Sequence, residues 1–282
     1  MLLLLSLLSL LLHPTVPTTI KWPGVPSSPT SASSNTETLN TALQNLEPNM
    51  TLILGSPNTT YWLAGGVYAE GLKNVTIQLD GTLKFQEGRE GWPTEDCSKG
   101  TCVKKAIYIT TSSNLLLTSS SPSGGTVDGS GAPWWGYANY LLHGEDRPKL
   151  FTLYNGTDVT VENWHFRQSA YHTFHADDCA RVTVRGCTVD NRANGQDGHG
   201  PANLAALNTD GFDVSGRDIH IHDCKVWNQD DCFTIVPLTA AAINSKCTEN
   251  VLVENVEASG LGLTVGSIKP AKDHACIKVR GF

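Results

Sequence analysis

A short phrase recurs along this chain, and the repeat constrains the fold more than any other feature. Each copy begins with a polar residue, continues with alternating β-formers and ends at a small or polar turn. The copies include Asn74-Val-Thr-Ile-Gln-Leu, Asp158-Val-Thr-Val-Glu-Asn and Asp218-Ile-His-Ile-His-Asp. Alternation of apolar and polar residues is typical of a half-buried β-strand. The repeat therefore predicts an all-β chain built by stacking copies of one unit.

The spacing of the copies favours a right-handed parallel β-helix, which is a solenoid. The first apolar positions fall at 75, 115, 159, 182, 219 and 251, so successive copies are 40, 44, 23, 37 and 32 residues apart. The shortest spacing suits one coil, and the longer ones suit either a coil with an inserted loop or two coils with one degenerate copy. Stacked coils bury a continuous core. A sandwich of antiparallel strands is the alternative, but it does not explain why each copy begins with the same phrase.

The first 45 residues differ from the repeats in composition. Residues 2–12 form an apolar run that is too short to span a bilayer comfortably, and a stretch rich in Pro, Ser and Thr follows it. We interpret 1–18 as a secretory signal peptide and 19–45 as a flexible segment. Residues 46–282 then form one β-helix domain, with no membrane association after signal removal.

Cysteines and sequons agree with a secreted, extracellular glycoprotein. The eight cysteines have no paired Cys-x-x-Cys spacing, so disulfides are a better interpretation than zinc, and the closest two predict a local Cys97–Cys102 bridge. Four Asn-x-Ser/Thr sequons are present, at Asn49, Asn58, Asn74 and Asn155.

The net charge of −7 argues against a nucleic-acid partner, because such proteins normally carry a basic surplus. A polyanionic ligand is compatible with this charge if the cations gather in one cleft.

Two acidic segments carry the candidate chemistry. They read Asn208-Thr-Asp-Gly-Phe-Asp and Asn228-Gln-Asp-Asp-Cys, and Asp210 and Asp230 are 20 residues apart, close to one coil. In a parallel solenoid this spacing places both on the same face of adjacent coils, about 4.8 Å apart, with Asp231 nearby. Crowded carboxylates raise at least one pKa, which prepares an acid beside ionised partners for glycosidic hydrolysis. The alternative is that these residues serve only in turns, and we interpret Asp213 in that way.

With these acidic segments the chain resembles glycoside hydrolase family 28, the pectin-degrading polygalacturonases. Further matching text is Gly125-Thr-Val-Asp-Gly-Ser-Gly and Gly262-Leu-Thr-Val-Gly-Ser, and the similarity covers roughly 60–277. The resemblance implies a right-handed parallel β-helix that hydrolyses α-1,4-galacturonosidic bonds of pectic polysaccharide with inversion, without metal or other cofactor. We expect a monomer.

The resemblance also implies residue roles. Asp230 would be the general acid, Asp210 and Asp231 would activate water, and Asn208 would hold the geometry of the cleft. Lys269 is the candidate ligand for a substrate carboxylate. Trp134 and the tryptophan after it could either stack on a sugar or pack in the core.

Two departures from the family pattern leave alternatives open. Leu261 stands where the family has histidine in Gly-His-Gly, and the family's Arg-x-Lys pair is missing before Phe282, so the domain looks incomplete at its C-terminus. The chain could instead be a catalytically impaired pectin-binding β-helix or an inactive fragment. A polysaccharide lyase shares the solenoid, but the tandem acidic pair argues against one.

Overall fold

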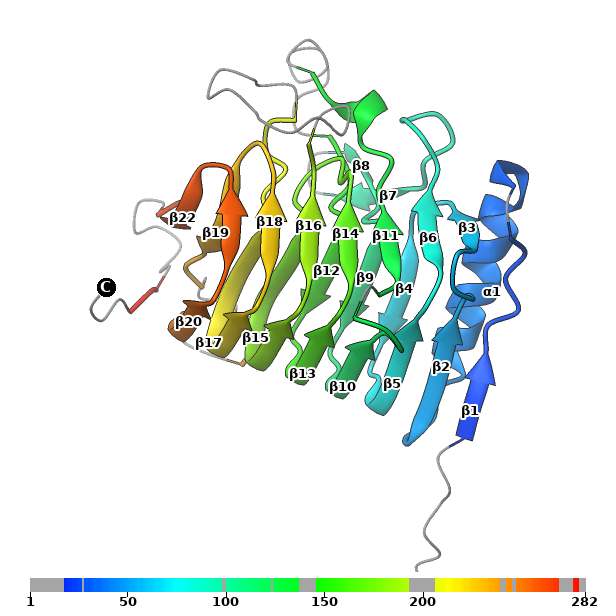
Figure 1. Cartoon of the computed structure of the whole chain (residues 1–282), viewed down its shortest axis with the longest axis horizontal. Helices are drawn as coiled ribbons and strands as arrows, with labels where there is room; N and C mark the ends of the chain where they lie inside the picture. Colours follow the sequence, from blue (N-terminus) through cyan, green and yellow to red (C-terminus); the bar gives the residue numbers. More distant parts are fainter. Residues whose placement is uncertain are drawn as a thin grey trace, which may run out of the picture.

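The computed structural model is a right-handed parallel β-helix, with coils stacked along one axis (Figure 1). The prediction of fold class is confirmed. The residues that the structure describes are 18–26, 28–97, 100–122, 124–136, 146–192, 206–238, 242–244, 247–268 and 276–278.

Three parallel faces wrap around the core. The face that later carries the candidate site, here called the site face, consists of β4 (Val67–Glu70), β9 (Ile107–Thr110), β12 (Phe151–Tyr154), the first parts of β15 (Phe174–Arg185) and β17 (Phe212–His222), β19 (Asp231–Ile235) and β22 (Gly262–Val265). The repeat face consists of β1 (Thr18–Lys21), β2 (Met50–Leu54), β5 (Lys73–Leu79), β10 (Ser113–Thr118), β13 (Thr157–Glu162), the second parts of β15 and β17, and β20 (Glu249–Glu254). The third face consists of β3 (Thr60–Leu63), β6 (Thr82–Phe85), β11 (Thr126–Asp128), β14 (His165–Arg167), β16 (Thr188–Asp190), β18 (Lys225–Trp227) and β21 (Glu257–Ser259).

The recurring phrase has a backbone cause. The polar residue that opens each copy lies in the left-handed region, with φ between 52° and 57°, and it turns the chain into the repeat face. Asn and Asp tolerate this conformation better than most residues. These residues are Asn74, Asn114, Asp158, Arg181, Asp218 and Asn250.

The register decides between the two interpretations of the long spacings. The first apolar residues of the copies pair in one continuous row, from Val75 through Leu115, Val159, Val182 and Ile219 to Val251. Each copy is therefore one coil, and the longer spacings contain inserted loops.

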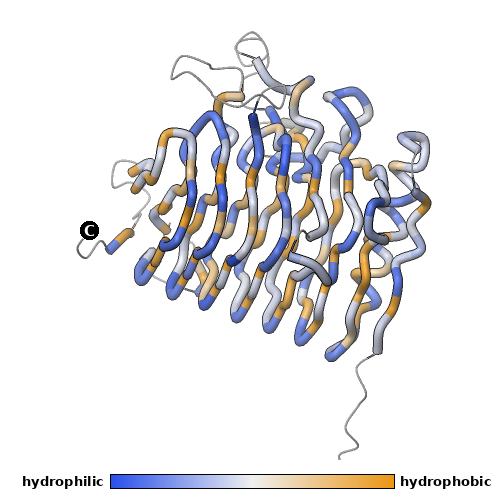
Figure 2. The backbone as a smooth tube through the Cα atoms, in the orientation of Figure 1, coloured by the Kyte–Doolittle hydropathy of each residue, from blue (hydrophilic) through white to orange (hydrophobic). Residues whose placement is uncertain are grey.

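A ladder of phenylalanines fills the core beneath the site face. Phe151, Phe174, Phe212 and Phe233 occupy successive coils, with ring centroids 5.2 to 5.7 Å apart. All four are buried, and apolar and polar residues alternate along the strands around them (Figure 2). Such a packed interior fixes the height of each coil and hence of the residues outside it.

The prediction of a flexible segment over 19–45 is wrong. β1 pairs with β2, and α1 (Ala32–Gln44) lies against the N-terminal end of the stack (Figure 1). Leu39 and Leu43 of α1 are buried, and Thr36 Oγ1 donates to Ala64 O at 2.8 Å. The helix covers core that would otherwise face solvent at this end, as the terminal units of solenoids require. The predicted signal peptide lies outside the described residues apart from Thr18.

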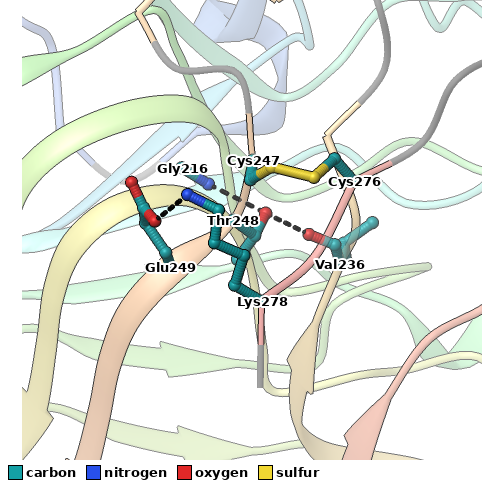
Figure 3. Close-up of a disulfide and its surroundings, with 7 residues drawn as sticks. All are labelled: Gly216, Val236, Cys247, Thr248, Glu249, Cys276 and Lys278. Carbon is teal, nitrogen blue, oxygen red and sulfur yellow. Dashed lines mark hydrogen bonds and ion pairs between the residues drawn. A yellow bond between two sulfur atoms is a disulfide. The ribbon is translucent and has the colours of Figure 1, made fainter. Parts of the chain in front are cut away.

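The structure contains two disulfides among its described residues. Cys97–Cys102 joins the antiparallel strands β7 (Thr94–Cys97) and β8 (Gly100–Val103), as predicted. Cys247–Cys276 ties a distant segment to the start of β20 (Figure 3), where Lys278 Nζ also pairs with Glu249 at 2.6 Å. The other four cysteines, Cys179, Cys187, Cys224 and Cys232, are free and buried.

The two adjacent tryptophans pack in the core and do not stack on a sugar. Both Trp134, which ends the 3-10 turn η2 (Ala132–Trp134), and Trp135 are buried. Among the described residues, no helix has the length and apolar character needed to cross a membrane.

Candidate functional site

One row of residues leads into the strands of the site face, and we call it the entry row. Backbone hydrogen bonds of 2.9 to 3.0 Å join each coil to the next at this level. They place five residues in line along the solenoid axis: Lys105, Lys149, His172, Asp210 and Asp231. The row therefore changes from basic to acidic along the axis.

A second row faces outward from the middle of the same strands, and we call it the outer row. Its order follows the strand register: Tyr68, Tyr108, Thr152, His175, Asp213 and Thr234. Both rows border the same outer surface, because His172 of the entry row directly contacts Asp213 of the outer row.

The predicted carboxylates converge at the acidic end of these rows. One oxygen from each of Asp210, Asp230 and Asp231 lies within 4.8 Å of the others. Gly211 makes this approach possible, because a Cβ there would lie 2.4 Å from Cys232 O of the next coil. The spacing of about one coil between the two acidic segments thus brings the three groups together as predicted.

The crowding strongly affects the ionisation of Asp210. Burial, together with the charges of Asp213, Asp230 and Asp231, raises its pKa to about 7 against the lowering effect of His172. Burial also raises the pKa of Asp231, although Thr264 Oγ1 donates to this carboxylate at 2.7 Å. The cluster therefore retains a proton near neutral pH, as a site for acid–base chemistry requires.

The backbone around Asp230 fixes the orientation of its side chain. The amides of Asn208 and Asp231 donate to its two carboxylate oxygens at 2.8 and 2.9 Å. Leu261 N donates to the main-chain oxygen of Asp230 at 2.8 Å, while the Leu261 side chain is 66% exposed. Asn208 thus contributes to the geometry of the site through its main chain.

His172 is a site residue that the sequence did not identify. Its Nδ1 contacts Asp213 Oδ2, and its Nε2 lies 3.9 Å from Asp210 Oδ1. Asp213 lies within β17 and is 2% exposed, so the interpretation of this residue as turn structure is wrong. Burial alone would raise the pKa of Asp213, but contact with His172 and the nearby charge of Lys149 lower it. Asp213 is therefore an ionised, buried carboxylate that holds His172 beside Asp210.

The remaining predicted site residue, Lys269, lies outside the described residues. Within the described part of the chain, two sets of side chains have the spacing of possible metal ligands: His172 with Asp210 and Asp213, and Asp210 with Asp230 and Asp231. Both sets coincide with the acid–base cluster.

Comparison with known proteins adds a family and a fold. The sequence model of "Glycosyl hydrolases family 28" matches residues 63–280. The chain is 33% identical over 160 residues to probable endopolygalacturonase C of Aspergillus aculeatus, which covers 56% of this chain and 37% of that protein. It is 32% identical over 163 residues to a polygalacturonase of Saccharomyces cerevisiae, covering 57% and 39%. The chain therefore spans about two fifths of the length of these relatives.

Solved structures share the architecture at low sequence identity. Endo-xylogalacturonan hydrolase from Aspergillus tubingensis matches with a TM-score of 0.70 and 19% identity, over 89% of this chain and 60% of that chain. Polygalacturonase from Erwinia carotovora ssp. carotovora matches with a TM-score of 0.65 and 20% identity, over 90% and 66%. These similarities concern the fold.

Proposed function

Because the chain belongs to glycosyl hydrolases family 28, we propose that it hydrolyses α-1,4-galacturonosidic bonds in pectin or polygalacturonate. The observation that carries the proposal is the convergence of Asp210, Asp230 and Asp231 from two adjacent coils, with the pKa of Asp210 raised to about 7. Glycosidic hydrolysis needs one carboxyl that protonates the leaving oxygen and another that activates water. Such a cluster provides both.

We assign the roles as follows. Asp230 is the general acid, held in place by two main-chain amides, and Asp210 with Asp231 activates the water. The resting proton is on Asp210, because burial and three neighbouring carboxylates act on it. The carboxylate oxygens lie within 4.8 Å of one another, a gap that one bridging water can span, so this proton can be relayed to Asp230 through water as substrate enters.

Inversion at the anomeric carbon is part of the proposal and rests on the family. The nearest oxygens lie within 4.8 Å, which is closer than the roughly 6.5–9.5 Å between the carboxyl groups of most inverting enzymes. The anomeric form of the first product is therefore the informative measurement. Proton NMR during early hydrolysis of an α-linked oligogalacturonate should show the β-anomer first, and the α-anomer would contradict inversion.

The reaction class has a direct test. The purified protein with polygalacturonate should release new reducing ends without the ultraviolet absorbance of an unsaturated product. Absorbance together with loss of activity in a chelator would indicate a lyase. Absence of both signals would favour the alternative of a catalytically impaired, pectin-binding β-helix.

We further propose that the protein is a secreted, monomeric glycoprotein acting on the cell wall. Support for secretion and glycosylation comes from the apolar run at 2–12, the two disulfides and the four sequons. Asn49, Asn58 and Asn74 are exposed and Asn155 is half-buried. A shift in mass on glycosidase treatment of protein collected from the culture medium would test this.

A further inference from the structure

The basic end of the site face has a pocket outside the carboxylate cluster. This pocket has a volume of about 120 Å³, and Tyr68 and Tyr108 of the outer row line it together with Lys104, Lys105 and Glu95. We call it the Lys/Tyr pocket. Glu95 belongs to β7, so the hairpin β7–β8 forms one side of the pocket.

The aromatic and basic groups of the pocket are already arranged in contact. The rings of Tyr68 and Tyr108 are 5.8 Å apart and inclined by 56°, and Lys105 Nζ lies 4.6 Å from the centre of the Tyr108 ring. Lys105 Nζ also lies 4.0 Å from Glu95, and Lys104 lines the same pocket. The hydroxyl of Tyr68 donates to Glu70 at 2.6 Å, and this bond raises the pKa of Tyr68 to about 12, so the phenol stays neutral.

The pocket lies in line with the carboxylates. Three parallel steps in the register separate Tyr108 from Asp213, which corresponds to about 14 Å at about 4.8 Å per strand. Between them the entry row contains Lys149, which is half-buried and close enough to interact with Asp213 and Asp177. A chain that extends along the solenoid axis from the carboxylates therefore passes Lys149 and then reaches the Lys/Tyr pocket.

We propose that the Lys/Tyr pocket is a remote subsite that binds an unesterified uronate residue of the same chain whose bond is cleaved at the carboxylates. The inference rests on the proposed function. A uronate has an apolar ring face for Tyr108 and a carboxylate for Lys104 or Lys105, and charge-assisted hydrogen bonds of this kind are strong. His175 cannot supply the charge, because burial and Lys149 lower its pKa to about 3.

The chemistry of the pocket also gives a substrate preference. Methyl esterification removes the negative charge of a galacturonate, so the ester offers the lysines of the pocket no carboxylate to bind. We therefore expect unesterified oligomers to gain affinity at this subsite and fully methylated oligomers of equal length to gain none.

Binding measurements on an inactive background test the subsite. In Asp230→Asn protein, calorimetry with oligogalacturonates of increasing length should show a gain in affinity once the oligomer reaches the pocket. Adding Lys104→Gln and Lys105→Gln should lower the affinity for long oligomers about tenfold, which corresponds to about 1.4 kcal/mol of binding free energy. Digalacturonate, which is too short to span both sites, should bind equally to both proteins. Lys73→Gln, on the repeat face, is the matched control.

Each outcome separates the subsite from the proposed function. An equal loss of affinity for short and long oligomers, or no loss for either, would refute the proposed subsite. Hydrolysis of short oligomers by the Lys104→Gln/Lys105→Gln protein with Asp230 intact would still support the proposed function. Length-dependent binding without hydrolysis would retain the subsite and refute the activity.

Discussion

The two ends of the site face have opposite chemistry on the same backbone. At one end the entry row and outer row present Asp210 and Asp213, and at the other end they present Lys105 and Tyr108. Parallel hydrogen bonds and the phenylalanine ladder keep successive coils in register between these ends. The solenoid backbone therefore fixes the position of each group, and the identity of the side chain on each coil determines the local chemistry.

The electrostatic environments of the two ends also differ. At the acidic end the ionisable groups are buried and interact strongly, so the pKa of Asp210 is raised to about 7. At the basic end Lys105 retains a side-chain exposure of 33%. We therefore expect changes at the acidic end to affect turnover and pH dependence, and changes at the basic end to affect affinity and its dependence on salt, since exposed charges are screened.

The largest expected effect is on turnover at the acidic end. Asp230→Asn removes the transferable proton and should lower kcat by about 10²–10⁴-fold, the usual contribution of general acid catalysis. An oligogalacturonide with an activated aryl leaving group needs little protonation and should recover most of this loss. Because Asn can accept only one of the two main-chain hydrogen bonds at this position, the melting temperature should be measured alongside.

Asp223→Asn is the matched control for this change. Asp223 is exposed, pairs with His222, and has a left-handed φ of 54° that Asn accepts readily. Its turnover should equal that of the parent. Unchanged turnover in folded Asp230→Asn protein would refute the assigned role.

The next effect is on stability, because burial of Asp210 and the neighbouring carboxylates oppose folding when this group ionises. Its pKa is about 3.9 in an unfolded chain and about 7 in the fold. The folded state thus binds the proton more tightly, and Asp210 makes the fold progressively less stable as pH rises from about 4 to about 7. Asp210→Asn should be inactive yet melt at a higher temperature than the parent at pH 8, with little difference at pH 4.

Calorimetric melting curves at both pH values would check this prediction. A variant that melts below the parent at pH 8 would show that the ionised carboxylate stabilises the fold, against the expected sign. Asp223→Asn serves again as the control, since it changes an exposed carboxylate.

The sequence predicted the parts of this architecture that depend on short-range pattern. The row from Val75 to Val251 follows from the alternation within each copy. The spacing of the acidic segments predicted their place on adjacent coils, but it paired Asp210 with Asp230, whereas the register places Asp231 level with Asp210. α1 escaped detection because Ala32–Gln44 is rich in Ser, Thr and Asn, with little apolar periodicity beyond Leu39 and Leu43.

The remainder of the site depends on loops of irregular length. Along the entry row, Lys105 and Lys149 are 44 residues apart, Lys149 and His172 are 23 apart, and His172 and Asp210 are 38 apart. No fixed period relates these positions, so the sequence did not show that His172 faces Asp213 or that the lysines continue the row. The stacked coils bring these residues into line.

The third effect concerns the pH profile. If Asp210 acts as the base, kcat/KM should rise with pH through about 7, because the carboxylate must be ionised. His172 is the neighbour that lowers the pKa of Asp210, so His172→Asn should move the rising limb of the kcat/KM profile to higher pH. His220→Asn, on the repeat face and 37% exposed, should leave it in place.

Two other results would be informative for His172. Loss of stability without movement of the limb would mean that His172 only neutralises Asp213. A parent profile that falls with rising pH through about 7 would make Asp210 the proton donor and would reverse the roles assigned to Asp210 and Asp230.

The smallest expected effect is at position 261. Leu261 contributes its main-chain N–H to Asp230 O, and its side chain is 66% exposed, so Leu261→His keeps the contact that positions the acid. Surface substitutions usually change stability by less than about 0.5 kcal/mol, and the pairing of His172 with Asp213 already provides an imidazole beside Asp210. We therefore expect Leu261→His to leave turnover unchanged or slightly lower in an active parent. An inert parent that gains hydrolysis of polygalacturonate on this change would show that Leu261 disables the acidic end and that His172 does not replace the missing histidine.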